Sequence, residues 1–192
     1  MMKPRQLLCK TLLAVGCLQM VIVLVSGQPT GKVCPPVAGA PGCVCDHPDG
    51  KIDVRPLANS DGTPKYTNLT DPNKYPYSIN PCTPFSVKGG CTNVFICQGD
   101  PHIAGEFYSI ADNGTEKIYI DTDNKVYLYY TTSVRFAKIY LECDKSVTGT
   151  PQWDIKGDSA VVLHYEFTMK HASVCPGGFR GRGGGSNEIK GL

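Results

Sequence analysis

Two polar residues at short, defined distances from cysteines are the main candidates for a binding site in this sequence. Gln98 directly follows Cys97, and Arg135 lies eight residues before Cys143. A planar amide and a forked guanidinium each present hydrogen-bonding groups in pairs, which suits them to vicinal hydroxyl groups. Taken one at a time, such residues are also ordinary at strand ends, so the surrounding elements must decide their role.

Residues with catalytic potential are scattered along the chain. Asp100 is followed by Pro101, which is common turn chemistry. None of the histidines lies in a metal-binding or nucleophile motif, so we expect no enzymatic activity, no metal and no cofactor. These histidines are His47, His102, His164 and His171.

The N-terminus has the composition of a secretory signal. Residues 1–27 combine Lys3, Arg5 and Lys10 with the apolar run TLLAVGCLQMVIVLV. The run is slightly long, so an uncleaved signal anchor is the alternative, but Gln19 in its middle favours cleavage. No second apolar stretch of spanning length follows, and we therefore expect a secreted or lumenal protein without a membrane span.

Removing this signal changes the charge and the number of cysteines. The formal net charge of +2 loses three basic residues, which leaves about −1 and no electrostatic footprint for nucleic acid. Ten cysteines become eight, an even number that indicates a disulfide framework in an oxidising compartment. Cys43 and Cys45 lack a second thiol pair at metal-finger spacing, so zinc binding is not expected.

One folded domain with mobile ends is the predicted organisation. Residues 28–42 form a Pro/Gly-rich segment, residues 43–176 have the size of one domain, and residues 177–192 form a flexible Gly-rich tail. We expect both flanking segments to be mobile, because neither has much apolar surface to bury.

The central part of the chain has the periodicity of β-strands. Apolar residues alternate with others in 117–130, which predicts a hairpin, and again in 135–143 and 159–170. Residues 94–98 form a short apolar strand, and no window of helical length has an amphipathic stripe. The sequence therefore predicts an all-β fold, a sandwich or flattened barrel of antiparallel sheets with disulfide bonds.

Two N-glycosylation sequons lie in polar, turn-like segments. They are Asn68-Leu-Thr and Asn113-Gly-Thr. Such triplets also arise by chance, but in a secreted chain they predict exposed acceptors and hence a glycoprotein.

Five blocks of sequence, in this order, resemble one family of lectin domains. The blocks are CDHPDGKIDVRPLA, YSINPCTPF, CTNVFICQ, VRFAKIYLECD and YEFTMKHASVC. Together they resemble the mannose 6-phosphate receptor homology (MRH) domain, including the lectin domains of the cation-independent receptor, over about residues 43–176. The resemblance implies a flattened β-barrel of two crossed sheets with a shallow sugar pocket at one end.

The resemblance also implies the residues of that pocket. Gln98, Arg135 and Tyr165 match the Gln, Arg and Tyr with which the family binds a terminal mannose. The family's Glu is absent; Asp158 is the nearest carboxylate, and Asp154 is the second choice. Aspartate is one methylene shorter, so we expect it to reach the sugar through backbone movement or a water molecule.

The resemblance implies disulfide pairs as well, and it implies that one bridge of the family has been lost, since both of its cysteines are absent together. An exchange of partners among the first four cysteines stays open. The implied pairs are Cys34–Cys43, Cys45–Cys82, Cys91–Cys97 and Cys143–Cys175.

These features together predict a lectin-like domain of the secretory or endolysosomal pathway, with lysosomal targeting among the family's roles. Residues 131–134 before Arg135 contain hydroxyl groups but no cation, so neutral mannose fits better than phosphomannose. Mannose-bearing glycoproteins are the expected partners, with a further protein partner possible for cargo transport. The alternative is a sugar-incompetent interaction module with the same fold. A carboxylate beside Arg135 and Gln98 would favour the lectin.

Overall fold

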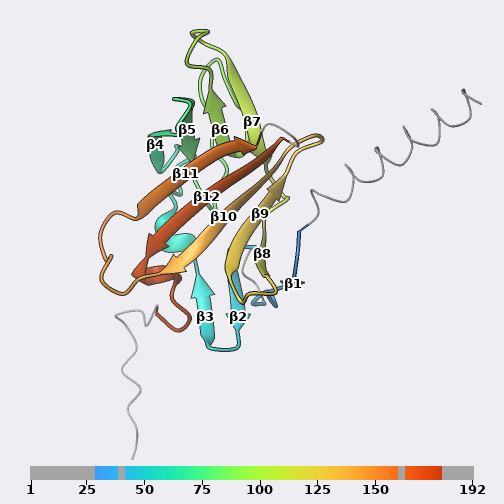
Figure 1. Ribbon diagram of the computed structural model, residues 1–192, viewed down its shortest axis with the longest axis vertical. Helices are drawn as coiled ribbons and strands as arrows, with labels where there is room; N and C mark the ends of the chain where they lie inside the picture. The colour runs from blue at the N-terminus through green and yellow to red at the C-terminus, as the bar shows by residue number, and fades with distance from the viewer. Residues whose placement is uncertain (1–28, 39–41, 160–162, 179–192) are drawn as a thin grey trace, which may run out of the picture.

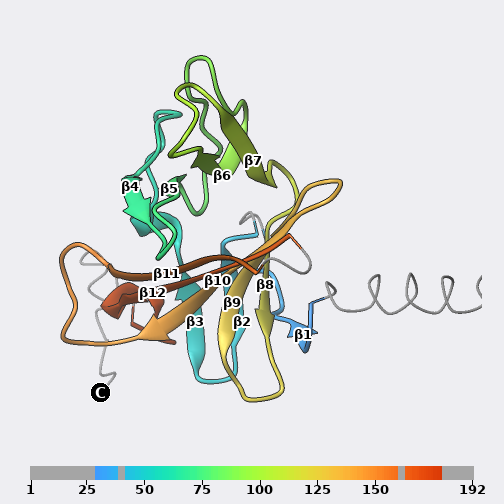
Figure 2. The same cartoon turned by 45° about the horizontal axis from the view of Figure 1, so that its top comes forward.

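The computed structural model describes residues 29–38, 42–159 and 163–178 (Figure 1). The predicted signal at 1–27 and nearly all of the predicted tail at 177–192 lie outside the described residues. The described chain is almost entirely β-structure, as predicted, and its two main sheets cross one another (Figure 2). They do not close into a continuous barrel.

The larger sheet has six strands in the order β1-β8-β9-β10-β12-β11. All neighbours are antiparallel except β10 and β12, which run parallel along their whole length. The predicted hairpin at 117–130 is confirmed as β8 and β9, and the predicted strand at 135–143 as β10. The bounds are β1 Lys32–Val33, β8 Lys117–Ile120, β9 Val126–Thr131, β10 Phe136–Cys143, β11 Gln152–Ser159 and β12 His164–His171.

The smaller sheet has four antiparallel strands in the order β4-β5-β6-β7, and a separate hairpin is formed by β2 and β3. The predicted strand at 94–98 is confirmed as β6, which lies inside the four-stranded sheet. The bounds are β2 Val44–His47, β3 Gly50–Asp53, β4 Tyr66–Thr70, β5 Pro76–Ile79, β6 Val94–Gly99 and β7 Phe107–Asp112.

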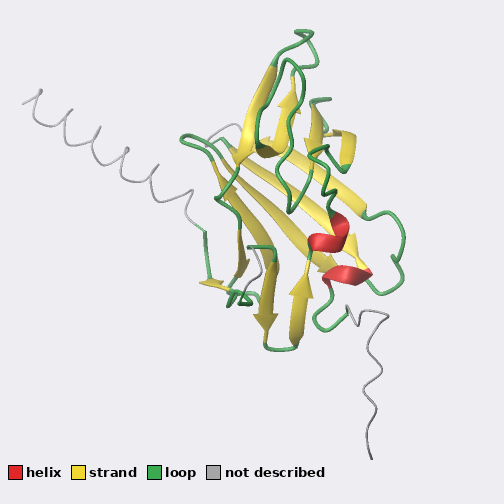
Figure 3. Ribbon diagram, turned by 180° about the vertical axis from the view of Figure 1, so that it is seen from behind, coloured by secondary structure: helices red, strands yellow, loops and turns green. Residues whose placement is uncertain are grey.

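Among the described residues, the helical segments are the short 3₁₀ turns η1, Arg55–Leu57, and η2, Ala172–Val174 (Figure 3). Within the described ranges, no helix has the length and apolarity needed to cross a membrane.

The main core lies between the two sheets. Along β12, Tyr165, Phe167 and Met169 are buried, whereas the residues between them are half-buried on the other face. This period of two is what a strand with one face on a core produces. Burying a side chain such as Phe167 stabilises the fold by about 1.5–3 kcal/mol. A second, smaller cluster packs Phe85 and Val94 against the Cys91–Cys97 bridge.

Two of the four disulfides differ from the implied pairing. The structure contains Cys91–Cys97 and Cys143–Cys175, as implied. Cys34–Cys43 and Cys45–Cys82 are replaced by Cys34–Cys45 and Cys43–Cys82, the exchange that the sequence left open.

The path of the chain before β2 explains this exchange. Pro36 bridges Cys45, and the Asp46 N–H donates to the Pro35 carbonyl oxygen at 2.9 Å. The preceding segment therefore runs beside β2 and brings Cys34 to Cys45. Cys43 is not used by this pair and forms its disulfide with Cys82.

The N-terminal segment is also better attached than predicted. We expected residues 28–42 to be mobile, but β1 pairs with β8, with Lys32 opposite Ile120. The Tyr127 hydroxyl donates to the Thr30 carbonyl oxygen at 2.6 Å. Strand pairing, this hydrogen bond and the Cys34–Cys45 bridge attach the described part of this segment to the larger sheet and to β2.

Candidate functional site

Gln98 lies on β6, an interior strand of the smaller sheet, between Tyr77 on β5 and Tyr108 on β7. Its side chain is only 6% exposed, and its Nε2 donates to the Tyr77 hydroxyl at 2.9 Å. Cys97, next to it, is bound in the Cys91–Cys97 disulfide. The amide is therefore held in one orientation by its neighbours and by the backbone.

Arg135 reaches the same place from the larger sheet. It ends the tight turn before β10, where its N–H donates to Thr132 Oγ1 at 2.9 Å. The guanidinium carbon lies 5.6 Å from the centroid of the Tyr108 ring, a cation–π contact that joins the two sheets. Its Nε is buried and has no hydrogen-bond partner in the described structure.

Tyr165 and Asp158 are opposite one another on the antiparallel strands β12 and β11. The Tyr165 hydroxyl donates to Gln98 Oε1 at 3.5 Å, the limit for a hydrogen bond. Burial raises the pKa of the Tyr165 phenol, Asp158 raises it further, and Arg135 lowers it. The structure therefore brings Gln98, Arg135, Asp158 and Tyr165 together at the crossing of the sheets.

Asp158, the carboxylate predicted to replace the family's Glu, lies in this cluster, opposite Tyr165. Burial raises the pKa of Asp158, Asp71 adds to this rise, and the attraction of Arg135 opposes it. No ion pair joins it to Arg135, and its Oδ1 is buried without a hydrogen-bond partner among the described residues. Asp154, the second choice, is exposed opposite Thr168 on the other face of the sheet, so it lies outside this cluster.

Asp71 and Tyr77 belong to the same cluster and were missed from the sequence. Asp71 is 4% exposed in the turn between β4 and β5, and its Oδ2 accepts a hydrogen bond from the Tyr77 hydroxyl at 3.2 Å. An added Cβ at Gly157 would overlap this carboxylate. Asp71-Pro resembles ordinary turn chemistry, and no sequence spacing connects it to Gln98.

The chemistry of the cluster favours hydroxyl groups. Asp71, Asp158 and Arg135 give two negative charges and one positive charge. Arg135 Nε supplies an unused donor and Asp158 Oδ1 an unused acceptor, each costing about 1–3 kcal/mol when buried and unpaired. A hydroxyl both donates and accepts, so hydroxyls on adjacent carbons can satisfy both atoms. No described group of three or more His, Cys, Asp or Glu is placed to hold a metal.

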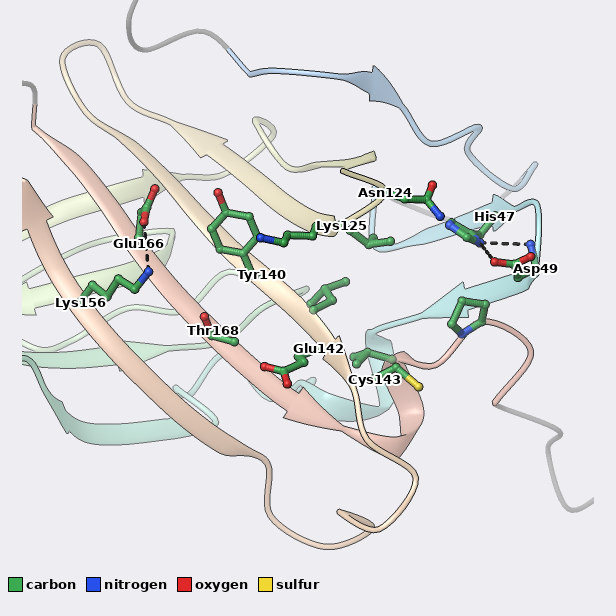
Figure 4. A pocket seen from close by; sticks show the side chains of 14 residues that line it. His47, Asp49, Asn124, Lys125, Tyr140, Glu142, Cys143, Lys156, Glu166 and Thr168 are labelled. Atoms are coloured by element: carbon green, nitrogen blue, oxygen red, sulfur yellow. Dashed lines mark hydrogen bonds and ion pairs between the residues drawn. The ribbon is translucent and has the colours of Figure 1, made fainter. Parts of the chain in front are cut away.

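A separate hollow of ≈ 500 Å³ lies on the outer face of the larger sheet, next to the β2–β3 hairpin (Figure 4). Its lining includes Tyr140, Glu142 and Thr168 on the sheet face opposite to Tyr165, and His47 on the β2–β3 hairpin. None of the four predicted site residues lines it. The hollow is thus a different surface from the predicted sugar pocket.

Comparison with known proteins supports the fold. No protein-family model matches the chain, and no curated protein matches it. Among solved structures the chain is similar to chicken IGF2R domain 11, with a TM-score of 0.55 and 14% sequence identity. The match covers 74% of this chain and 95% of that domain, which is of the MRH type. The chain therefore has the fold of an MRH-type domain, as its ordered sequence blocks predicted.

Proposed function

We propose that this protein is a lectin-like domain that binds mannose-type glycans through Gln98, Arg135, Asp158 and Tyr165. One observation carries the proposal: Arg135 Nε and Asp158 Oδ1, a buried donor and a buried acceptor, are left unpaired within a cluster of otherwise hydrogen-bonded polar groups. Five other buried polar atoms of the described residues also lack a partner, so the weight of this observation lies in where these two atoms are, beside Tyr165 and Gln98 in one polar cluster. A ligand hydroxyl supplies the missing partner.

Each side chain has a distinct role in this proposal. Arg135 donates to one sugar hydroxyl, and Asp158 accepts from that hydroxyl or its neighbour. Tyr165 and Gln98 contact the next hydroxyl with the phenol and the amide oxygen. Asp71 is a positioning residue, because it holds Tyr77, which in turn holds the Gln98 amide.

The charge of the cluster supports neutral sugars as ligands. Two carboxylates around one guanidinium repel a phosphate group, and the segment 131–134 adds no cation. We therefore propose unphosphorylated mannose as the preferred terminal sugar.

The setting that we propose is outside the cytosol. Four disulfides are typical of proteins that fold in an oxidising compartment. The N-terminal composition agrees with a secretory route. Mannose-bearing glycoproteins of the secretory or endolysosomal pathway are then the natural partners, and no catalysis is required of the site.

A second candidate function, a protein-interaction module, is supported by two exposed apolar side chains next to the cluster. Val134 is 56% exposed and Leu163 is 41% exposed. Leu163 lies beside the start of β10, two residues after Val134, because the Phe136 N–H donates to the Leu163 carbonyl oxygen at 3.2 Å. Exposed apolar groups in neighbouring loops can contribute to a protein interface.

A glycan-array screen of the oxidised protein distinguishes the two functions. We expect binding to glycans with terminal mannose, at least tenfold weaker in Arg135→Ala and in Asp158→Ala, because each variant removes a charged hydrogen-bonding group worth about 1.5–3 kcal/mol. Asp154→Ala is the matched control, since it removes an exposed carboxylate from the same strand. Absence of binding by folded wild-type protein would reject the lectin and favour the interaction module.

A further inference from the structure

The four-stranded sheet has two open edges, and each edge carries one of the two sequons. Its order is β4-β5-β6-β7, so β4 and β7 each pair on one side only within the described structure (Figure 1). Asn68 lies within β4, and Asn113 directly follows β7. An edge strand presents unpaired N–H and C=O groups on which another chain can add a strand.

On β4, the acceptor asparagine lies at a bulge. The pairing with β5 jumps from Tyr66 opposite Ile79 to Leu69 opposite Tyr77, so Asn68 has no cross-strand partner. Its φ of 57° is in the left-handed region that asparagine tolerates, and its side chain is exposed. Its amide nitrogen is therefore accessible at the rim of the sheet.

On the opposite rim, Asn113 is exposed at the start of the turn that leaves β7. Its Nδ2 makes one long hydrogen bond, 3.4 Å, to the exposed Asn93 Oδ1. Gly114 follows with a φ of 82°, which turns the chain away from the strand. This acceptor therefore also projects into solvent.

The edge strands of the six-stranded sheet have features that hinder pairing with another chain. The edge strand β1 has only two residues. At the other edge, β11 has an irregular register between Ile155 and Gly157, where Lys156 projects with a largely exposed side chain. Short strands, bulges and lysines are the usual means of protecting an edge. The edge strands of the four-stranded sheet have register shifts as well, but they are five and six residues long and neither contains a lysine. Neither edge strand of the six-stranded sheet contains a sequon.

We propose that Asn68 and Asn113 carry N-linked oligosaccharides that cover the two edges of the four-stranded sheet and keep it from pairing with other chains. In the reaction, Asn Nδ2 bonds to the anomeric carbon of an oligosaccharide carried on a lipid diphosphate. The bond from that carbon to the diphosphate oxygen breaks, the lipid diphosphate leaves, and the amide nitrogen loses one proton. The proposal requires passage through the secretory pathway, and it is independent of sugar binding at Arg135.

Occupancy is measured first, on the full chain secreted from eukaryotic cells. Treatment with peptide N-glycosidase should convert glycosylated Asn68 and Asn113 to aspartate, and peptide mass spectrometry before and after the treatment detects this change. Native deglycosylation of the folded protein, and separately the N68Q/N113Q variant, should shift the protein from monomer to associated species in size-exclusion chromatography. Unmodified asparagines, or a fully monomeric deglycosylated protein, would overturn the proposal.

Two variants in the N68Q/N113Q background separate edge coverage from general solubility. Thr67→Lys with Phe107→Lys places charges on the exposed edge strands, and we expect it to restore the monomer without any glycan. D123N/K125T creates a sequon in the exposed turn between β8 and β9, which lies at the end of the molecule opposite to the four-stranded sheet (Figure 2). If a glycan at that turn restores the monomer equally well, edge coverage is the wrong explanation.

Discussion

The two sheets of this domain are stabilised by different means. In the six-stranded sheet, β10, β11 and β12 have eight residues each, and β12 is paired on both sides. The strands of the four-stranded sheet have four to six residues, and beside it a small cluster forms around the Cys91–Cys97 bridge. Both sheets contribute to the main core, but the larger sheet has the longer paired strands, whereas the smaller sheet has beside it a local cluster closed by a short-range bridge.

The candidate site takes residues from both sheets, so it depends on both kinds of stabilisation. Arg135, Asp158 and Tyr165 come from the larger sheet, and Gln98 and Tyr77 come from the smaller one. A disturbance of either sheet moves one half of the site relative to the other. Five experiments test this comparison.

The first experiment removes one phenyl ring from the larger sheet and one from the small cluster beside the smaller sheet. Phe167 is fully buried in the main core, 5.2 Å from the Tyr77 ring, so Phe167→Ala should lower the free energy of unfolding by about 3–5 kcal/mol. Phe85→Ala empties the small cluster and should cost less, because that region can open locally. Equal losses in urea unfolding would contradict the comparison.

The second experiment separates stability from binding with two disulfides. Loop entropy predicts a loss of about 4 kcal/mol without Cys143–Cys175, whose cysteines are 32 residues apart, and about 2 kcal/mol without Cys91–Cys97, which are 6 apart. We expect the opposite order for mannose affinity in paired Cys→Ser variants, because Gln98 follows Cys97 directly. The same order in unfolding and in calorimetric titration would show that the bridge does not position the amide.

The third experiment adds one methyl group where the sheets meet. Gly157→Ala places a Cβ against the Asp71 carboxylate at a φ of 75°, and should cost about 1–3 kcal/mol and weaken mannose binding. Gly62→Ala is the control, because its φ is 78° and its surroundings are open. In Gly62→Ala, the free energy of unfolding should fall only by the cost of an alanine at positive φ, and the affinity for mannose should be unchanged.

The fourth experiment is a pH titration of binding. Asp158 must be ionised to accept a hydroxyl proton, and its pKa lies above the ordinary value of 3.8 because of burial and Asp71. Mannose affinity should therefore be maximal at neutral pH and fall on acidification. The fall should begin at a higher pH than it would if the carboxylate were an exposed aspartate. Asp158→Asn should weaken binding and remove this dependence, whereas Asp154→Asn should leave the pH profile unchanged.

The smallest effect is expected for an exposed ion pair of the larger sheet. Lys156 Nζ lies 3.7 Å from Glu166 Oε2, and the lysine side chain is 61% exposed. Lys156→Ala should change the free energy of unfolding by about 0.5 kcal/mol or less. A larger loss in thermal or urea unfolding would mean that this edge of the sheet depends on charge pairing.

The sequence predicted the strands whose side chains alternate without interruption. The hairpin of β8 and β9 and the strand β10 follow from such alternation. β11 was missed because Lys156 and Gly157 at its bulge break the period of two. β4 was missed because Asn68 adopts a left-handed conformation within the strand.

The same division applies to the candidate site. Gln98, Arg135 and Tyr165 could be found because their distances from half-cystines are set along the chain. Asp71 could not, because its place in the cluster comes from a turn of one sheet packing against Gly157 of the other. Contacts between distant segments produce no fixed spacing in the sequence, so they cannot be predicted from it. The same applies to the disulfide partners of Cys43 and Cys45.

The parallel pairing of β10 with β12 has a consequence for how the protein is made. Along the chain β11 precedes β12, yet in space β12 lies between β10 and β11. During synthesis, β10 therefore gains its second neighbour only after both β11 and β12 have been made. Tyr165 lies on β12, so the candidate pocket cannot assemble before that strand has left the ribosome.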